Sequence, residues 1–178
     1  ILPANVEDAT ISISAPPAYN GEAQSPMVHL AFGEATLTEG VDYRISGSTG
    51  TNAGAYTMTI TGMGDFTGTY ELPWVIEKAV PEIITPTAGE LTYGQKLSES
   101  VLSDSAWKWF NPGVIPTVNN SGYVTFIPVE DSRNYDYTGI EGYAIWESVE
   151  VIARVIPVTV NKATPTVTPI IPEGEYTE

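Results

Sequence analysis

The chain has 178 residues, of which 42% are hydrophobic and 16% are charged, a composition typical of a globular protein. It carries 22 acidic residues against 7 Lys and Arg, and the resulting net charge of −15 disfavours binding to nucleic acids or to anionic lipid headgroups. With no cysteine and one histidine, the sequence offers no disulfide, no thiol chemistry and no zinc site, and no apolar run approaches the about 20 residues that span a bilayer. We therefore expect no cofactor, no metal and no membrane insertion.

In the first half of the chain, apolar and polar residues alternate with a period of two, which is typical of half-buried β-strands. The clearest such segments are 10–14, 27–32 and 56–60. Between them lie turn signals at 20–21, 47–48, 52–54 and 62–65, where Gly or Asn supplies the positive φ that tight turns need. Strand, turn and strand thus follow one another along this half of the chain.

The second half follows the same pattern, with strands expected at 90–93, 122–126, 143–146 and 149–155. One stretch, 96–102, favours a short helical turn, because Leu97 and Val101 are four residues apart and could both face a sheet. The 14 prolines and 16 glycines exclude long helices. The predicted fold class is all-β, either a sandwich or a β-grasp-like sheet, with at most one short helix.

A boundary phrase occurs twice in the chain. Lys78-Ala79-Val80-Pro81 recurs as Lys162-Ala163-Thr164-Pro165, 84 residues later, and an apolar alternating segment precedes each copy. A fixed period of this size predicts two tandem modules, 1–79 and 80–163, with 164–178 as the start of a further repeat or a linker. Proline after each Lys-Ala favours a short, semi-rigid joint. Modules in series usually set reach or spacing, which lowers the expectation of catalysis.

Four motifs follow one another in the first module: Tyr19-Asn20-Gly21, Leu37-Thr38-Glu39-Gly40-Val41-Asp42-Tyr43, Asn52-Ala53-Gly54-Ala55-Tyr56 and Gly62-Met63-Gly64-Asp65-Phe66-Thr67-Gly68-Thr69. In this order and spacing they resemble the motifs of bacterial Ig-like repeats in large surface proteins, which implies an Ig-like sandwich for this module. Phe66 stands where Tyr is usual in that pattern.

The second module contains a different set of motifs: Lys78-Ala79-Val80-Pro81, Tyr93-Gly94-Gln95, Leu97-Ser98-Glu99-Ser100, Trp107-Lys108-Trp109 and Pro128-Val129-Glu130-Asp131-Ser132-Arg133-Asn134-Tyr135, followed by an enlarged segment at 136–146. These motifs resemble repeats of the MBG, or mostly β-grasp, type. The two resemblances together imply an extracellular protein of the bacterial cell surface or cell wall, in which such modules act as stalk or adhesin segments.

Aromatic residues of the second module are the candidate ligand-binding residues. Trp107 and Trp109 are two apart, so both rings would leave a strand on the same face and, with Phe110, could form a platform for a sugar. The alternative is that they fill the core of a small module. The enlarged segment supplies a second aromatic group, since insertions on a rigid scaffold often carry binding residues. That group consists of Tyr135, Tyr137, Tyr143 and Trp146.

Other chemistry has little support. His29 stands between Val28 and Leu30 and is expected to point away from their apolar face, so a Ser-His-Asp triad is not predicted. The stretch 130–136 is rich in oxygen ligands but lacks the glycine and closing glutamate of an EF-hand, and an Asx-type turn explains it better. Asp42 is likewise expected to make a structural hydrogen bond at a turn.

Lys78 and Lys162 could form an isopeptide crosslink to an asparagine, or could be ordinary boundary lysines. The leading hypothesis for the chain is a non-enzymatic stalk or spacer segment whose partners are neighbouring repeats of the same chain. The alternative is a module that binds a host glycan or protein through its aromatic surface, and an accessory module of a secreted glycosidase is also compatible with the sequence.

Overall fold

A computed structural model describes residues 2–117 and 121–167 of the chain. The fold is all-β, as the alternating pattern predicts, and the helical structure among the described residues consists of two 3-10 turns of three residues each. The chain divides into two compact units. Unit 1 comprises Ile1–Ile83 together with Val129–Ile140, and unit 2 comprises Ile84–Pro128 and Glu141–Glu178.

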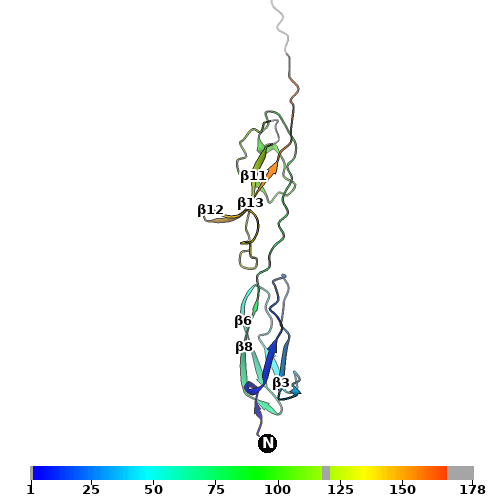
Figure 1. Ribbon diagram of the computed structural model, residues 1–178, viewed down its shortest axis with the longest axis vertical. Helices are drawn as coiled ribbons and strands as arrows, with labels where there is room; N and C mark the ends of the chain where they lie inside the picture. Colours follow the sequence, from blue (N-terminus) through cyan, green and yellow to red (C-terminus); the bar gives the residue numbers. More distant parts are fainter. Residues whose placement is uncertain (1, 118–120, 168–178) are drawn as a thin grey trace, which may run out of the picture. The chain divides into compact units, whose positions relative to one another are not determined.

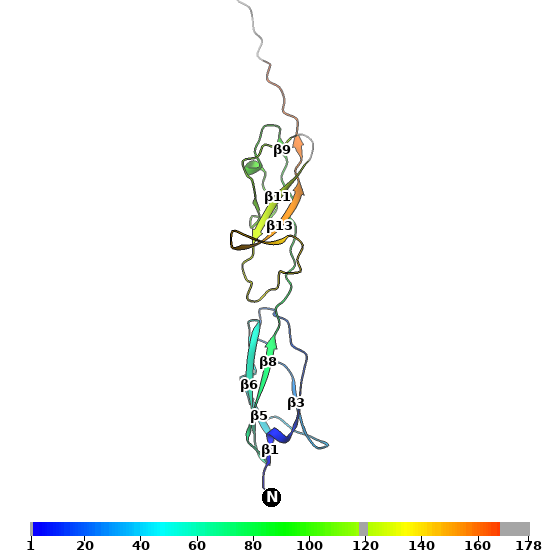
Figure 2. The same ribbon diagram turned by 60° about the vertical axis from the view of Figure 1, so that its left-hand side comes forward.

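Unit 1 is a β-sandwich-type unit (Figures 1 and 2). One sheet has the order β2-β3-β4, a second has the order β5-β6-β8, and β1 pairs with β7. The elements are β1 (Ala4–Asn5), η1 (Val6–Asp8), β2 (Thr10–Ile13), β3 (Val28–Phe32), β4 (Ala35–Thr36), β5 (Tyr43–Ser46), β6 (Gly54–Gly62), β7 (Phe66–Thr67) and β8 (Thr69–Ile76).

The core of unit 1 follows from the period of two. On β6, Met58 and Ile60 are fully buried, whereas Thr57 is exposed and the intervening Thr59 is half-buried. Ile60 packs in one cluster with Leu30 of β3, and Met58 packs in another with Trp74 of β8. His29 on β3 is exposed, as its place between two apolar residues predicts.

Unit 2 contains the antiparallel sheet β10-β11-β13-β12 and a parallel pair of β9 with β14. Its elements are β9 (Leu91–Thr92), η2 (Leu97–Glu99), β10 (Lys108–Trp109), β11 (Gly122–Pro128), β12 (Tyr143–Trp146), β13 (Val149–Pro157) and β14 (Val160–Asn161). Its core cluster combines η2, both terminal strands and the central sheet. The buried members are Leu91, Leu97, Trp109, Ile156, Val158 and Val160.

The short helical turn predicted at 96–102 is present only as η2. Leu97 is buried in the core, but Val101 is 80% exposed, so the expectation that both face the sheet was wrong. The reason is geometric. The turn ends at Glu99 and Ser100 is already extended, so positions i and i+4 do not share a helical face.

The segment Val129–Ile140, called here the docked segment, connects β11 to β12, two strands of the unit 2 sheet, yet it packs as part of unit 1. The sequence placed it in the second module. Unit 1 is therefore discontinuous in sequence, and the chain passes between the units three times, after Ile83, after Pro128 and after Ile140.

Candidate functional site

Asn134 of the docked segment is a buried polar residue of unit 1, with an exposed fraction of 6%. Its side-chain oxygen accepts a hydrogen bond from the backbone N–H of Ala53 at 2.8 Å. Its side-chain nitrogen donates to Oδ1 of Asn52 at 3.1 Å and to Oδ2 of Asp131 at 2.9 Å. All the donors and acceptors of this amide except one lone pair are thus used, which is what burial of an amide requires.

Hydrogen bonds between Lys78-Ala79 and the docked segment complete this attachment. The N–H of Ala79 donates to the Asn134 carbonyl at 3.0 Å, and the N–H of Asp136 donates to the Ala79 carbonyl at 2.8 Å. The Lys78 amine donates to the Ser132 carbonyl at 2.7 Å. The repeated Lys-Ala phrase is therefore an attachment point in unit 1, and the Lys78 amine is bonded to a backbone carbonyl.

The turn within the docked segment is of the Asx type, as predicted. Oδ1 of Asp131 accepts from the backbone N–H of Asn134 at 3.1 Å. Hydrogen bonds from the hydroxyl and the backbone N–H of Thr138 hold the pKa of the Asp136 carboxyl below its ordinary value, and Lys78 adds a smaller effect in the same direction. Among the described residues, no three His, Cys, Asp or Glu side chains are grouped as metal ligands.

Asp42 has the structural role predicted for it. Its Oδ2 accepts a hydrogen bond from the backbone N–H of Thr38 at 2.7 Å, which closes the turn before β5. Burial, and then the nearby carboxylates of Glu39 and Asp42, raise the pKa of the Tyr43 hydroxyl.

The six aromatic residues predicted to bind a ligand do not form one site. Trp107 and Trp109 are 4% and 8% exposed, and the Trp109 indole N–H donates to the Ser100 carbonyl at 3.0 Å. This corrects the expectation of an exposed platform at these two positions, because both rings lie in the interior of unit 2. Their shared face was predicted, but that face is the inner one.

Tyr135 and Tyr137 lie in the docked segment and are half-buried in unit 1. The Tyr135 ring meets the Tyr19 ring edge-on, with centroids 5.3 Å apart, and lies 6.3 Å from the Tyr137 ring. Burial, and then Asp131, raise the pKa of the Tyr137 hydroxyl. These two tyrosines attach the segment to unit 1 by packing as well as by hydrogen bonds.

Trp146 and Tyr143 stand on β12, which projects from unit 2 as a hairpin with β13 (Figure 1). Trp146 is 43% exposed, and its ring lies 5.0 Å from Phe110 and 5.9 Å from Phe126. Tyr143 is half-buried and donates to Oε1 of Glu150 at 2.7 Å. Trp146 is thus the one predicted binding tryptophan that lies on the surface.

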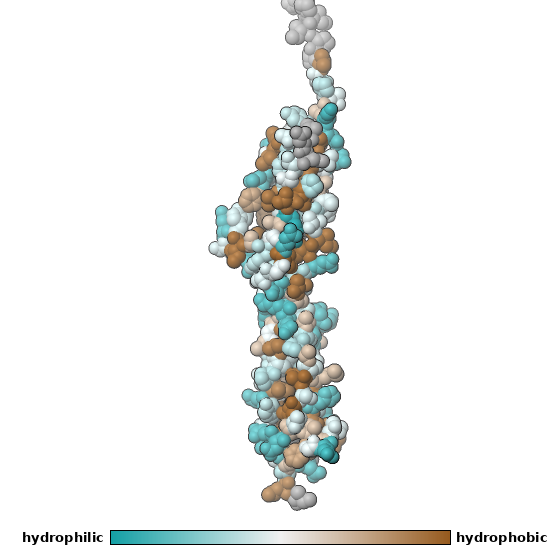
Figure 3. All heavy atoms as spheres, in the orientation of Figure 1, coloured by the Kyte–Doolittle hydropathy of each residue, from teal (hydrophilic) through white to brown (hydrophobic). Residues whose placement is uncertain are grey.

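The register of the sheet puts these rings on an apolar outer face. Phe126 pairs with Ala153 and Val124 with Val155, so all four side chains project to the face opposite the core. Brown atoms are visible on the surface of unit 2 beside the projecting hairpin (Figure 3). We call this surface the outer-face patch; it consists of Phe110, Val124, Phe126, Trp146, Val149 and Val155. The sequence did not predict Phe126 and the valines as surface residues of a candidate site, because β-strand alternation does not reveal which face of a sheet is covered.

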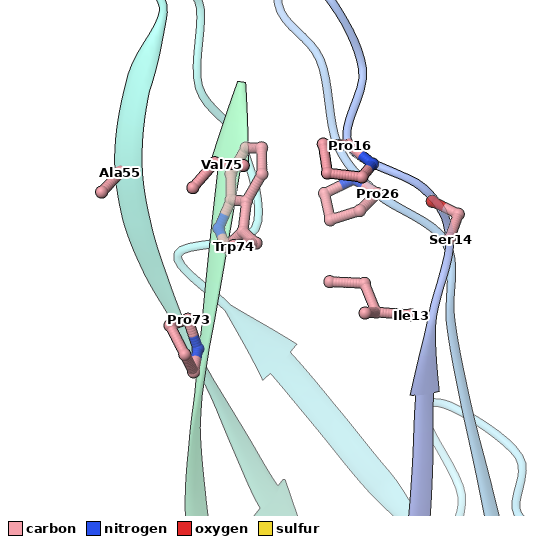
Figure 4. A pocket seen from close by; sticks show the side chains of 8 residues that line it. All are labelled: Ile13, Ser14, Pro16, Pro26, Ala55, Pro73, Trp74 and Val75. Atoms are coloured by element: carbon pink, nitrogen blue, oxygen red, sulfur yellow. The ribbon is translucent and has the colours of Figure 1, made fainter. Parts of the chain in front are cut away.

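Unit 1 also contains an apolar pocket of about 250 Å³ between β2 and β8 (Figure 4). Its lining residues are Ile13, Ser14, Pro16, Pro26, Ala55, Pro73, Trp74 and Val75. The Trp74 indole N–H is buried and has no hydrogen-bond partner among the described residues, and Figure 4 shows this nitrogen on the side of the ring away from Ile13 and Pro26. The pocket has no titratable side chain in its lining, so it offers no acid, base or charged nucleophile.

Comparisons of the chain with family models, with curated proteins and with solved structures found no match. Among the described residues, the structure contains no helix that is both long and apolar enough to cross a bilayer.

Proposed function

We propose that the chain is a non-enzymatic structural segment, a stalk or spacer of a larger bacterial cell-surface or secreted protein, built from an Ig-like and an MBG-type module. The support comes from a parallel pairing in each unit between an earlier segment of the chain and the segment at its Lys-Ala boundary. In unit 2, β9 near the entry of the chain pairs in parallel with β14 at its exit. In unit 1, Ala18 pairs in parallel with Glu77, with the Tyr19 N–H donating to the Glu77 carbonyl at 2.8 Å.

In unit 2, the parallel pairing of the entry strand β9 with the exit strand β14 has a mechanical consequence. The chain enters a parallel pair at one end and leaves it at the other, so a pull on the two termini slides the strands past each other. Several hydrogen bonds then bear the load together, whereas an antiparallel hairpin pulled at its open end is peeled one bond at a time. This geometry suits a segment that holds its length under tension.

Single-molecule pulling of the full chain tests the proposal. We expect each unit to resist extension until a discrete unfolding event. Tyr93→Pro removes the N–H that donates to the Asn161 carbonyl at 2.8 Å in unit 2. It should lower the unfolding force of unit 2, while the event of unit 1 in the same molecule serves as the control. Smooth extension of the wild type without discrete events, or an unchanged force in Tyr93→Pro, would overturn the proposal.

The outer-face patch supports a second candidate function, an adhesin module that binds a protein or a glycan through unit 2. Exposed aromatic rings gathered on one face are the feature that favours it. Among the aromatic residues of the predicted set, Trp146 is the one to test, since Trp107 and Trp109 are buried. We expect Trp146→Ala to abolish any binding to arrayed glycans or candidate proteins, with Phe32→Ala as an exposed aromatic control in unit 1. Binding that survives Trp146→Ala would exclude this surface.

A further inference from the structure

Unit 1 and unit 2 end in the same arrangement of strands. In unit 1, Glu77 pairs in parallel with Ala18, and its carbonyl accepts from the Tyr19 N–H at 2.8 Å. In unit 2, Asn161 pairs in parallel with Thr92, and its carbonyl accepts from the Tyr93 N–H, also at 2.8 Å. Tyr93 therefore corresponds to Tyr19, and the Lys-Ala that follows Asn161 corresponds to the Lys-Ala that follows Glu77.

In unit 1 this terminal surface is occupied. The Tyr19 ring packs edge-on against Tyr135, and the Lys78 amine donates to a carbonyl of the docked segment. The Ala79 backbone both donates to Asn134 and accepts from Asp136. Each of the three residues at the end of unit 1 thus has a partner between Asp131 and Asp136.

In unit 2 the corresponding residues are exposed. Tyr93 is 58% exposed, and Lys162 and Ala163 are exposed as well. Within residues 2–117 and 121–167, neither the Lys162 amine nor the Ala163 backbone has a hydrogen-bond partner. The Lys162 amine, the Ala163 backbone and the Tyr93 ring therefore match the groups that the docked segment covers in unit 1. In unit 2, no described segment covers them.

We propose that Tyr93, Lys162 and Ala163 form a docking surface for a loop of the sequence Asp-x-x-Asn-Tyr-Asp, supplied by a further β-module that follows this one. The same loop, Asp131–Asp136, occupies the matching surface of unit 1. Charge supports this occupant, because the docked segment carries three carboxylates against one arginine and Lys162 supplies a cation. In unit 1 the Asp136 carboxyl has its pKa lowered chiefly by the two hydrogen bonds from Thr138, and Lys78 adds a smaller effect in the same direction.

The inference explains why the Lys-Ala phrase repeats. The phrase recurs after 84 residues because each copy holds the loop of the module that comes next. The inference rests on the proposed function in one respect, since it requires that such modules follow one another in a chain. Hydrogen exchange at the two Lys-Ala sites is independent of the pulling experiment, so the two proposals can fail separately.

The direct test extends the full chain by a module whose loop is known. A second copy of residues 80–163 is inserted directly after Ala163, ahead of residues 164–178. The loop of the second copy then follows Lys162-Ala163 at the same distance in sequence at which the native loop follows Lys78-Ala79. Hydrogen exchange is then measured at the amides of Ala79 and Ala163. We expect the Ala163 amide to become protected to the level of Ala79, and the Tyr93 ring to become buried.

Two matched variants test which loop protects the Ala79 amide and which protects the Ala163 amide. Asn134→Ala in the appended copy should remove the protection of Ala163 and leave that of Ala79, and Asn134→Ala in the native copy should do the reverse. Fast exchange at Ala163 in a tandem chain whose appended β11 and β13 are protected would overturn the proposal. If the appended copy does not fold, a peptide of residues 129–140 is titrated onto the 178-residue chain. Chemical-shift changes at Tyr93, Lys162 and Ala163 then support the proposal, and their absence overturns it.

Discussion

The docked segment and the β12–β13 hairpin are neighbours in sequence and both carry aromatic residues of the predicted set, but the structure uses them in different ways. The docked segment carries Tyr135 and Tyr137 half-buried in unit 1 around the buried Asn134. The hairpin carries Trp146 at 43% exposure next to two backbone positions with positive φ, Glu147 at 48° and Ser148 at 69°. One stretch is held by polar contacts, and the other presents its rings to solvent.

The difference shows that aromatic density alone does not indicate a binding surface. The tyrosines of the docked segment lie beside the Asn134 side-chain amide, which is hydrogen-bonded to Ala53 and Asn52, so their rings pack against unit 1. The hairpin has no such polar anchor at its tip, and two residues other than glycine adopt left-handed backbone there, which costs stability. Strain next to an exposed tryptophan marks the hairpin, rather than the docked segment, as the region to examine for binding.

The largest effect that sharpens this comparison is expected from Asn134→Ala. The substitution leaves the buried Ala53 N–H without an acceptor, so unit 1 should lose about 2–3 kcal/mol. Hydrogen exchange of the β6 amides measures the loss. Arg133→Ala, at an exposed neighbouring position of the same segment, is the control and should change little. A loss no larger than that of the control would mean that the segment is not anchored through its asparagine.

Trp146→Ala is expected to have a smaller effect. The ring makes two aromatic contacts, with Phe110 and Phe126, and is partly hydrated, so its removal should cost about 1–2 kcal/mol. Trp109→Ala, in the core of unit 2, should cost about 3–5 kcal/mol in the same assay. Chemical unfolding followed by exchange of the β13 amides compares the two. Equal losses would show that Trp146 is a core residue and would remove the contrast with the docked segment.

What the sequence predicted well was local. The period of two identified β6 and its inner face, with Met58 and Ile60 buried, because alternation on a half-buried strand needs no knowledge of distant contacts. The Asx turn at Asp131 and the turn role of Asp42 were predicted for the same reason, since both side chains bond within four residues of the chain.

What the sequence could not predict depends on partners far away in the chain. Asn134 bonds to residues 81 and 82 positions earlier, and nothing near it in sequence indicates where its amide is satisfied. Trp107 and Trp109 were predicted to share a face, but whether that face is covered depends on the elements packed against it, such as η2. The Asp-x-x-Asn sequence at 131–134, which predicts an Asx-type turn, was the available local signal for the docked segment.

A stabilising change at the hairpin turn tests the strain at its tip. Glu147→Asn combined with Ser148→Gly gives the residues that tolerate positive φ at both central positions of a two-residue turn. Relief of the left-handed strain, partly offset by the backbone entropy of the new glycine, should give unit 2 a gain of about 1 kcal/mol. Thermal unfolding measures the gain, and the same pair of changes at exposed residues of the docked segment, where φ is negative, should bring none. A loss of stability would mean that the Glu147 or Ser148 side chain makes contacts that outweigh the backbone strain.

The smallest effect concerns the protonation of the docked segment. Thr138 donates two hydrogen bonds to the Asp136 carboxylate, at 2.7 Å and 3.0 Å, and these lower its pKa in the folded state from the ordinary value of 3.8. A carboxyl whose pKa is lower in the folded state stabilises the fold above pH 3.8, and this contribution is lost as the pH falls through the folded-state pKa. Thr138→Ala should raise the pKa of Asp136 towards 3.8 in a carbon-detected NMR titration. Thr138→Ser, which keeps the hydroxyl and the N–H, should leave it low. Asp136 also forms a hydrogen bond with Ala79 through its backbone, so the docked segment should stay in place in both variants. If the segment leaves unit 1 in Thr138→Ala, the Asp136 carboxylate, and not the Asn134 amide, holds it in place.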